Sequence, residues 1–302
     1  MADKIILHQT IQDLYAHLGI PIEQEAEFSI HRIEEIHGTE PIKSPVFRAN
    51  YYSFLFIESG SGNYTFDQRK FETKPHTIYF SNPGHLKSFE TYVHYTGHII
   101  SLSEAFLKEH IHQDVFEDFP FLLAEVVPPI YLAEDEYQPY KELLAQMMKE
   151  AGSTSSYKYK ILANLFVVAL LKIKERGWKS YDPLEEADRG STIVNDFKQN
   201  LEKTYRSLET FEELPRVQDY AGWQQLHPSY FNTVIKSKTG KSANNWITEK
   251  TLSEAKALLT HSQYSIKEIA YQLKFHEPTH FSKFFKKHTQ LTPNTYRQKG
   301  TS

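Results

Sequence analysis

Hydrophobic positions follow two different periods along this chain of 302 residues. Between residues 28 and 102, short β-branched and aromatic runs alternate with turn-forming residues such as Ser59–Asn63, Asn82–Gly84 and Gly97. Runs of this length and spacing predict strands of a sandwich or small barrel. A short helix is predicted before them, within IQDLYAHLGI and ending at Gly19. The predicted strand segments are FSIHRIEEIH, YYSFLFIES, NYTFD, HTIYFS and YVHYTGHIISL.

Two helices are predicted after the strands, over residues 135–151 and 157–176. The second is apolar around most of its circumference from Ile161 to Ile173, so it needs cover on several sides. The strands can cover one side, and either a second subunit or an intramolecular helical hairpin can cover another. Residues 178–191 are polar, contain Pro and Gly and lack periodicity, which predicts an interdomain linker.

From residue 192 onward, apolar residues recur with the 3.6-residue period of a helix, first at Ile193, Phe197 and Leu201. Seven helices are predicted within about 110 residues. Those that follow the first are Val217–Trp223, Pro228–Lys238, Ala243–Thr260, Ile266–Leu273, Pro278–His288 and Pro293–Gln298.

Two of these helix pairs have the same internal order, residues 217–240 and 266–293. A short helix, a tight turn and a second helix with one polar face form a helix–turn–helix, which places its second helix in the DNA major groove. In the first pair, the predicted buried side of that second helix consists of Phe231, Val234 and Ile235. The residues predicted to read base edges on its other side are Ser229, Asn232 and Thr233, with Lys236 at a phosphate.

The second pair repeats this arrangement, with Phe281, Phe284 and Phe285 as the predicted buried side. The long helix between the pairs would hold the two recognition helices about one DNA turn, ~34 Å, apart. The predicted base-reading residues are Thr279, Ser282 and Lys283, and the predicted phosphate contacts are Lys286 and Lys287.

Charge and composition agree with binding to double-stranded DNA. Residues 191–302 carry sixteen Lys and Arg against ten Asp and Glu, whereas the preceding residues carry eighteen against twenty-eight. A basic segment on an acidic chain is expected where only that segment meets phosphates. The chain has no cysteine, no predicted signal sequence and no apolar run long enough for a membrane span, so we expect a cytoplasmic protein without membrane contact.

The C-terminal motifs PSYFNTVIKSKTGKS, SEAKALLTHSQYSIKEIAYQLKF and FSKFFKKHTQLTPNTYR resemble the DNA-binding domain of the AraC/XylS family of transcriptional regulators. SGSGNYTF, the NPGH turn and TGHIISLSEAFL are similar to the cupin-type sensor domain that many members carry. The resemblance implies an α+β multi-domain fold, with a cupin-like β-barrel or sandwich and flanking helices before an all-α tandem helix–turn–helix. The expected parts are a sensor domain over 1–133, a dimerisation or packing hairpin over 134–177, a linker over 178–191 and a DNA-binding domain over 192–302.

Four positions depart from the family pattern. Lys274 and Gln290 stand where the family usually has Gly, and a side chain at positive φ would cost ~1 kcal/mol relative to Gly. In the first unit, Gln224 stands where an apolar residue is expected and Trp223 where a polar one is. These two leave open whether the first helix of that unit is rotated, which would move the base-reading assignments by one position.

The predicted sensor domain shows no enzyme-like constellation. It lacks the His-x-His pair with a following Glu by which a cupin enzyme holds a metal, and His110-x-His112 falls in or after a helix. We therefore expect no metal, no cofactor and no catalytic residue. The residues predicted to contact a small-molecule effector, which the two basic side chains would favour as an anion, are Arg48, Tyr52, Phe54, Tyr79 and Lys87.

The sequence thus predicts a DNA-binding transcriptional regulator controlled by an effector, acting as a homodimer, with RNA polymerase as a further partner. The alternative is a cupin-type enzyme or small-molecule binder whose helical tail serves oligomerisation.

Overall fold

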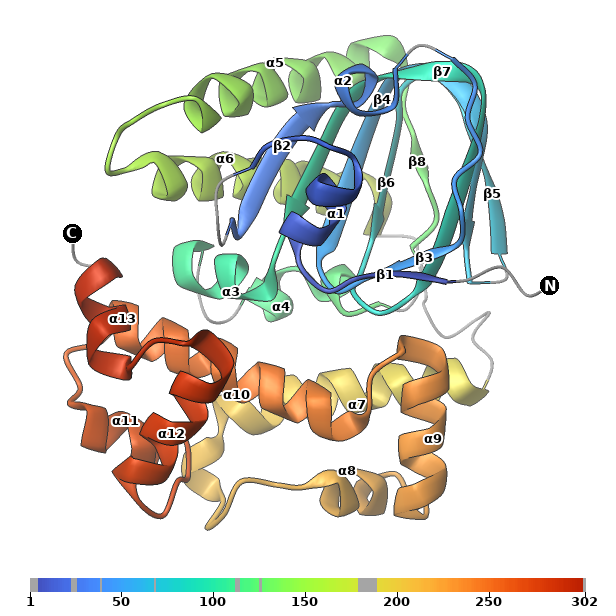
Figure 1. Cartoon of the computed structure of the whole chain (residues 1–302). Coiled ribbons are helices and arrows are strands. Elements are labelled where there is room, and N and C mark those ends of the chain that lie inside the picture. The colour runs from blue at the N-terminus through green and yellow to red at the C-terminus, as the bar shows by residue number, and fades with distance from the viewer. Residues whose placement is uncertain are drawn as a thin grey trace. The chain divides into compact units, whose positions relative to one another are not determined.

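The computed structural model describes residues 5–22, 26–38, 40–67, 69–111, 115–124, 127–178 and 189–300. The chain divides into two compact units, one of residues 1–111 with 117–186 and one of residues 112–116 with 187–302 (Figure 1). Within the described ranges, no helix combines the length and hydrophobicity that a bilayer span requires. Most of the predicted linker, and His112 of the His-x-His pair, lie outside the described residues.

The first unit is built on one sheet, which has eight strands in the described residues. The strand order is β1-β3-β7-β4-β6-β8, with β2 added to β7 and β5 added to β4. The antiparallel pair of β4 and β7 forms its spine, and the β-rich N-terminal fold is confirmed. The strands are β1 Ile6–His8, β2 Phe28–Arg32, β3 Phe47–Ala49, β4 Tyr52–Phe66, β5 Arg69–Thr73, β6 Thr77–Ser81, β7 Leu86–Leu102 and β8 Ile130–Tyr131.

The predicted turn at Ser59–Asn63 is wrong, because β4 continues through it. The register between β4 and β7 shifts there, so the glycines lie in bulges of a paired strand. A Cβ on Gly60 would lie 2.3 Å from the His94 carbonyl oxygen, and Gly60 has φ 103°. Gly97 likewise lies inside β7, with φ 134°. These glycines permit close strand approach, whereas the predicted turn at Asn82–Gly84 is confirmed.

The segment FSIHRIEEIH is only half a strand. Phe28–Arg32 forms β2, and Ile33–His37 forms the short helix α2, which ends at Gly38 with φ 68°. The predicted N-terminal helix is confirmed as α1 Ile11–His17. Its first turn is closed by a capping box, in which the Thr10 hydroxyl accepts from the Asp13 amide at 3.2 Å.

Helices α5, Glu134–Ala151, and α6, Lys158–Ile173, cover one face of the sheet (Figure 1). The ring of Phe166 in α6 packs edge-on against Phe54 of β4, with centroids 5.0 Å apart. Tyr140 of α5 contacts Phe56 of the same strand. The remaining short elements of this unit are α3 Glu104–Phe106, the π-helices Leu107–Ile111 and Lys174–Trp178, and the 3₁₀ turn Pro120–Leu122. The short helix α4, Val115–Asp118, spans the division, because residues 112–116 belong to the second unit.

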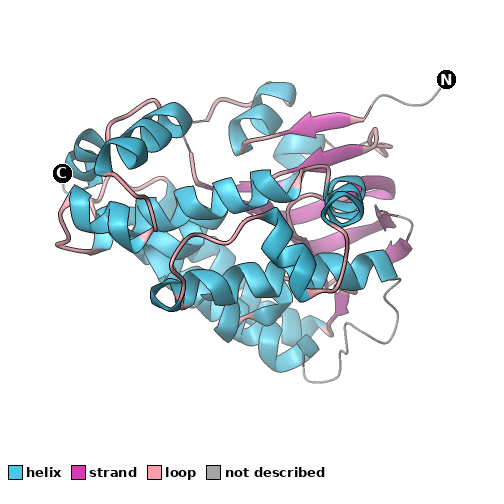
Figure 2. Cartoon of the chain, turned by 90° about the horizontal axis from the view of Figure 1, so that it is seen from below, coloured by secondary structure: helices cyan, strands magenta, loops and turns pink. Residues whose placement is uncertain are grey.

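The second unit is helical throughout its described part (Figure 2). Its core is one apolar cluster to which every helix from α7 to α13 contributes, with Phe197, Phe231, Ala255 and Phe281 fully buried. The predicted helix boundaries are confirmed to within a few residues. The helices are α7 Arg189–Arg206, α8 Val217–Trp223, α9 Pro228–Thr239, α10 Ala243–His261, α11 Ile266–Gln272, α12 Pro278–Thr289 and α13 Pro293–Gly300.

Candidate nucleic-acid interface

The two helix–turn–helix units, α8–α9 and α11–α12, turn in the same way. Each turn begins with a residue in the left-handed region, Gln225 with φ 56° and Lys274 with φ 60°. The next amide then closes back onto the preceding helix, from Leu226 to the Ala221 carbonyl and from Phe275 to the Ala270 carbonyl, both at 2.9 Å. These bonds satisfy carbonyls at the helix end and fix where the second helix starts.

The first helix of the first unit is not rotated. Trp223 is 46% exposed, as suits the polar position that it occupies. Gln224 is half-buried and donates from Nε2 to the Ile193 carbonyl of α7 at 3.3 Å. A side-chain hydrogen bond therefore replaces the apolar contact expected at Gln224, and the helix keeps its orientation.

The first recognition helix, α9, presents a polar face. His227 caps its start, because Nδ1 accepts from the Ser229 amide at 3.3 Å, and Pro228 occupies the first turn. Phe231 and Ile235 are fully buried on the opposite side. The exposed residues are Ser229, Tyr230, Thr233, Lys236 and Ser237.

Asn232 lies differently from its predicted place on this face. It is half-buried, and its Oδ1 accepts from the Ala243 amide at the start of α10, at 3.0 Å. Pairing with adenine requires both Oδ1 and the amide group. While the bond to Ala243 holds, Asn232 positions α9 against α10 and does not offer both groups to a base.

The second recognition helix, α12, repeats the arrangement with more positive charge. Phe281 and Phe285 are fully buried, and Ser282, which corresponds to Asn232, is half-buried. The Thr279 hydroxyl donates to Glu277 Oε2 at 3.0 Å. The exposed residues are Thr279, His280, Lys283, Lys286, Lys287 and His288. Tyr230 and His280 occupy equivalent exposed positions in the two units and were not among the predicted contacts.

The lysines of the recognition helices differ from those that stabilise the fold. Within the described part of the chain, Lys236, Lys283, Lys286 and Lys287 form no ion pair. Lys250 of α10, by contrast, is 1% exposed and pairs with Glu202 of α7 and with Glu254. Unpaired, exposed cations on two helix faces are available to phosphate oxygens.

The closing TPNTYR motif serves the fold of the second unit. The Thr292 hydroxyl caps α13 by accepting from the Thr295 amide at 3.2 Å. Tyr296 packs on Phe285, with ring centroids 5.3 Å apart. Arg297 donates to the Leu259 carbonyl at 3.2 Å and to the Tyr264 carbonyl at 2.7 Å. The motif therefore connects α13 to the C-terminal end of α10 and to the C-terminal half of α12.

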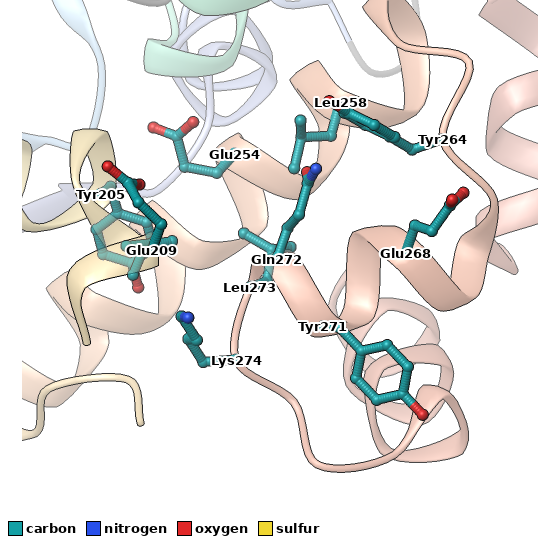
Figure 3. Close-up of a pocket in the computed structure, with 11 residues that line it drawn as sticks. Tyr205, Glu209, Glu254, Leu258, Tyr264, Glu268, Tyr271, Gln272, Leu273 and Lys274 are labelled. Carbon is teal, nitrogen blue, oxygen red and sulfur yellow. The ribbon is translucent and has the colours of Figure 1, made fainter. Parts of the chain in front are cut away.

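A cavity of about 610 Å³ opens beside α11, the first helix of the second helix–turn–helix (Figure 3). It is lined by α10 and α11 and by the segment after α7, with Glu209, Glu254 and Glu268 among its residues. Lys274 stands on its wall, directly after Leu273. Because no exposed residue of α9 or α12 lines it, this cavity is separate from the polar faces of the recognition helices.

The five predicted effector residues do not converge on one site. Tyr52 and Phe54 point toward the helices that cover the sheet, where Phe54 packs between Phe80 and Phe166. Arg48 is half-buried and donates to the Gly84 carbonyl at 2.7 Å; burial lowers its pKa. Tyr79 and Lys87 lie on the other face of the sheet, 2% exposed each. The five residues therefore lie on opposite faces of the sheet, Tyr52 and Phe54 on one and Tyr79 and Lys87 on the other.

No group of three or more His, Asp or Glu side chains within the described residues is placed to hold a metal ion. His85 is fully buried and pairs through Nδ1 with Asp67 Oδ2 at 2.9 Å. Asp67 also accepts from the Leu86 amide, so the pair closes the connection into β7.

Comparisons with known proteins divide along the same two units. A family model described as a helix-turn-helix domain matches residues 221–299, and one described as an AraC-like ligand binding domain matches residues 45–164. The chain is 34% identical over 110 residues to the regulatory protein PocR of Salmonella typhimurium, a match that covers 36% of each protein.

A second relative is YobQ of Bacillus subtilis, described as an uncharacterized HTH-type transcriptional regulator. It is 30% identical over 133 residues, which are 40% of this chain and 55% of that protein. The chain thus spans about a third to a half of the length of these relatives. The crystal structure of ToxT from Vibrio cholerae is 16% identical, covers 90% of this chain and 97% of its own, and has a TM-score of 0.37.

Proposed function

Because the chain belongs to the AraC family, we propose that it is a sequence-specific DNA-binding transcriptional regulator and not an enzyme. The observation that supports this most strongly is the repeated unit itself. Two recognition helices with the same turn, core and exposed polar face lie on the basic segment of an otherwise acidic chain. The proposed location is the cytoplasm, where such a protein meets chromosomal DNA and RNA polymerase.

The two helix faces would divide binding into affinity and specificity. Lys236, Lys286 and Lys287 neutralise phosphates, a contribution that is independent of sequence and sensitive to salt. Lys283, near the middle of α12, reaches guanine O6 and N7. The other proposed base-edge contacts are Ser229 and Thr233 of α9 and Thr279 and Ser282 of α12, together with the exposed Tyr230 and His280.

We propose further that α6 mediates a homodimer. Its inner side packs on α5 and the sheet, as in the intramolecular hairpin, yet an outer stripe remains open. Tyr157, Ile161, Val168 and Leu171 are 68%, 39%, 41% and 52% exposed. With the exposed Asn164 they repeat at intervals of four and three residues, the spacing by which two helices pair. A second copy of α6 is therefore the occupant that fits.

Sedimentation velocity tests the dimer. We expect the full chain to sediment as a dimer, and the double substitution Ile161→Lys with Val168→Lys to give a monomer. A matched double change to Ala should retain the fold and weaken association less. A monomeric wild-type protein at tens of micromolar would rule the α6 dimer out.

The N-terminal unit would control DNA binding through a small molecule. An effector acts only by binding one arrangement of the protein more tightly than another. The ligand-binding family model that matches residues 45–164 supports this control.

Capture of genomic fragments by the purified full chain, at near-physiological salt, tests the proposed function. We expect an enriched motif with two half-elements about ten base pairs apart. Lys283→Ala should relax the preference at one base pair, by about 1–3 kcal/mol. Lys287→Ala is the control, because loss of a phosphate contact weakens all sequences alike. Sequence-blind capture by the wild-type chain would count against a regulator.

A further inference from the structure

The first recognition helix, α9, is bonded at two points to α10, the helix that lies between the two helix–turn–helix units. Near the C-terminal end of α9, the Thr239 hydroxyl accepts from the Trp246 indole N–H at 2.9 Å, and both side chains are buried. About two turns earlier along α9, Asn232 Oδ1 accepts from the Ala243 amide at 3.0 Å. Two attachment points separated along a helix fix the direction of its axis, whereas one point alone leaves a pivot.

The second unit has no counterpart of the Asn232 bond. Ser282 occupies the position of Asn232, and Pro293 begins the helix after α12 as Ala243 begins the helix after α9. Proline has no N–H, so an equivalent bond cannot form. α10, unlike α13, connects one described recognition helix to the other. The bond is therefore present at the junction that sets the distance between the two readers.

Helix α10 carries this constraint to the second unit. It runs from Ala243 to His261 and contributes Ala255 and Leu259 to the apolar cluster that the helices of both units share. Near its far end, the Leu259 carbonyl accepts from Arg297 of α13 at 3.2 Å. The direction of α9 relative to α10 therefore decides where the first recognition helix lies relative to the second.

A small change in that direction is large on the scale of DNA. α9 has 12 residues, which gives it a length of ~18 Å. A swing of about 10° about its C-terminal end would move its first turn by ~3 Å, close to the ~3.4 Å rise of one base pair. The exposed Ser229 and Thr233 lie toward this moving end.

From these contacts we infer that Asn232 is a positioning residue, which fixes the separation of the two recognition helices and hence the spacing of DNA half-elements that the protein accepts. The inference rests on the proposed function and adds a determinant of spacing to it. It differs from a base-reading role, in which Asn232 would pair with one adenine and affect one base pair alone.

Binding to duplexes that differ only in spacing tests the inference. The two half-elements recovered by genomic capture are placed at their recovered spacing and one base pair closer or farther apart. Fluorescence anisotropy then gives the dissociation constant of the full chain for each duplex. We expect the wild type to favour the recovered spacing at least about tenfold. Asn232→Ala should reduce that preference about three- to tenfold, the range expected for one hydrogen bond.

Three further variants separate positioning from base reading. Ala243→Pro removes the same bond from its donor side, and Pro293 shows that the equivalent position accommodates the ring. Because it leaves the Asn232 side chain in place, it should broaden the accepted spacing without a loss confined to one base pair. Asn232→Asp keeps an acceptor oxygen at the start of α10 and should restore the wild-type spacing preference. Ser237→Ala, at an exposed position of α9 with no proposed base contact, should leave the preference unchanged.

Thermal unfolding midpoints establish which variants fold, and Ala243→Pro decides the matter if Asn232→Ala does not. An unchanged spacing preference in the folded variant would overturn the inference. So would a loss at one base pair that occurs in Asn232→Ala and not in Ala243→Pro, because this pattern identifies a base contact. A wild type that binds both half-elements equally well at every spacing would also overturn it, while leaving the sequence-specific regulator intact.

Discussion

Both helices of the second helix–turn–helix unit end at a residue other than glycine whose backbone is in the left-handed region. Lys274 has φ 60° and Gln290 has φ 62°. An L-residue in this region costs about 1–2 kcal/mol. Glycine removes that cost, but it loses more backbone entropy on folding, which destabilises the folded state by roughly 0.5–1 kcal/mol. We therefore expect Lys274→Gly and Gln290→Gly each to stabilise the unit by about 0.5–1 kcal/mol.

Neither substitution removes a bond that closes a helix. The Lys274 amide donates to Tyr271 at 3.0 Å and the Gln290 amide to Lys286 at 2.9 Å, and glycine retains both amides. The side chain of Gln290 donates to the Lys287 carbonyl at 3.3 Å from an exposed position, so its loss costs little. Lys274 only borders the cavity drawn in Figure 3.

Differential scanning calorimetry of the full chain measures the gain. For a helical unit of about 100 residues, 1 kcal/mol corresponds to a rise of about 4–8 °C in the midpoint of its transition. Lys267→Gly, at an exposed position inside α11, is the matched control and should lower stability by about 1 kcal/mol. If Lys274→Gly lowers the midpoint as Lys267→Gly does, the backbone-strain reasoning fails.

Three further changes test other parts of the fold. Arg297→Ala should cost the second unit roughly 1–2 kcal/mol in urea unfolding, because two carbonyls lose their donor. Asn294→Ala, at an exposed position of the same helix, should change stability by less than about 0.5 kcal/mol. Gly62→Ala should prevent accumulation of folded protein, since the alanine Cβ would lie 2.2 Å from the Glu90 carbonyl oxygen. Gly222→Ala, whose Cβ would have no atom within 4 Å, should stabilise α8 by about 0.5–1 kcal/mol. Equal expression and stability of the two variants would contradict this reasoning. Burial lowers the pKa of His37 to about 4, so the unfolded chain binds more protons between pH 6.5 and 4, and stability should fall by about 2 kcal/mol from pH 7 to 5. His37→Gln should flatten that slope, and an unchanged slope would exclude His37 as its source.

The helical unit was predictable because its signals are local. Pro228 and Pro278 mark the first turns of α9 and α12, and the 3.6-residue period gives their buried sides. Asn232 shows where local signals end. The helical period places Asn232 with Ser229 and Lys236, but the N-terminus of α10 lies beside it, and the Ala243 amide donates a hydrogen bond to the Asn232 side-chain oxygen.

The sheet was less predictable because pairing and facing depend on distant strands. Gly60 and Gly97 are turn formers by composition, yet β4 and β7 use them to approach closely. The predicted effector residues Tyr52 and Phe54 alternate with Ser53, so they face the helices while the serine faces inward. Alternation within YSF, FSI and ISL indicates which side chains of one strand share a face, but only the register shows that Ser53 lies beside Ser101 and Ser81.

The two recognition helices share a backbone plan but carry unequal charge. α9 exposes Lys236, whereas α12 exposes Lys283, Lys286 and Lys287. Since each neutralised phosphate releases counterions, the second unit would supply most of the salt-dependent affinity. The first unit, with Tyr230 and hydroxyl groups on its face, adds little charge and must gain its free energy from fit to base edges. The charge of α12 would therefore supply most of the affinity for any DNA, and α9 would add sequence discrimination to that proposed for Lys283, because its weakly charged face gains little from phosphates alone.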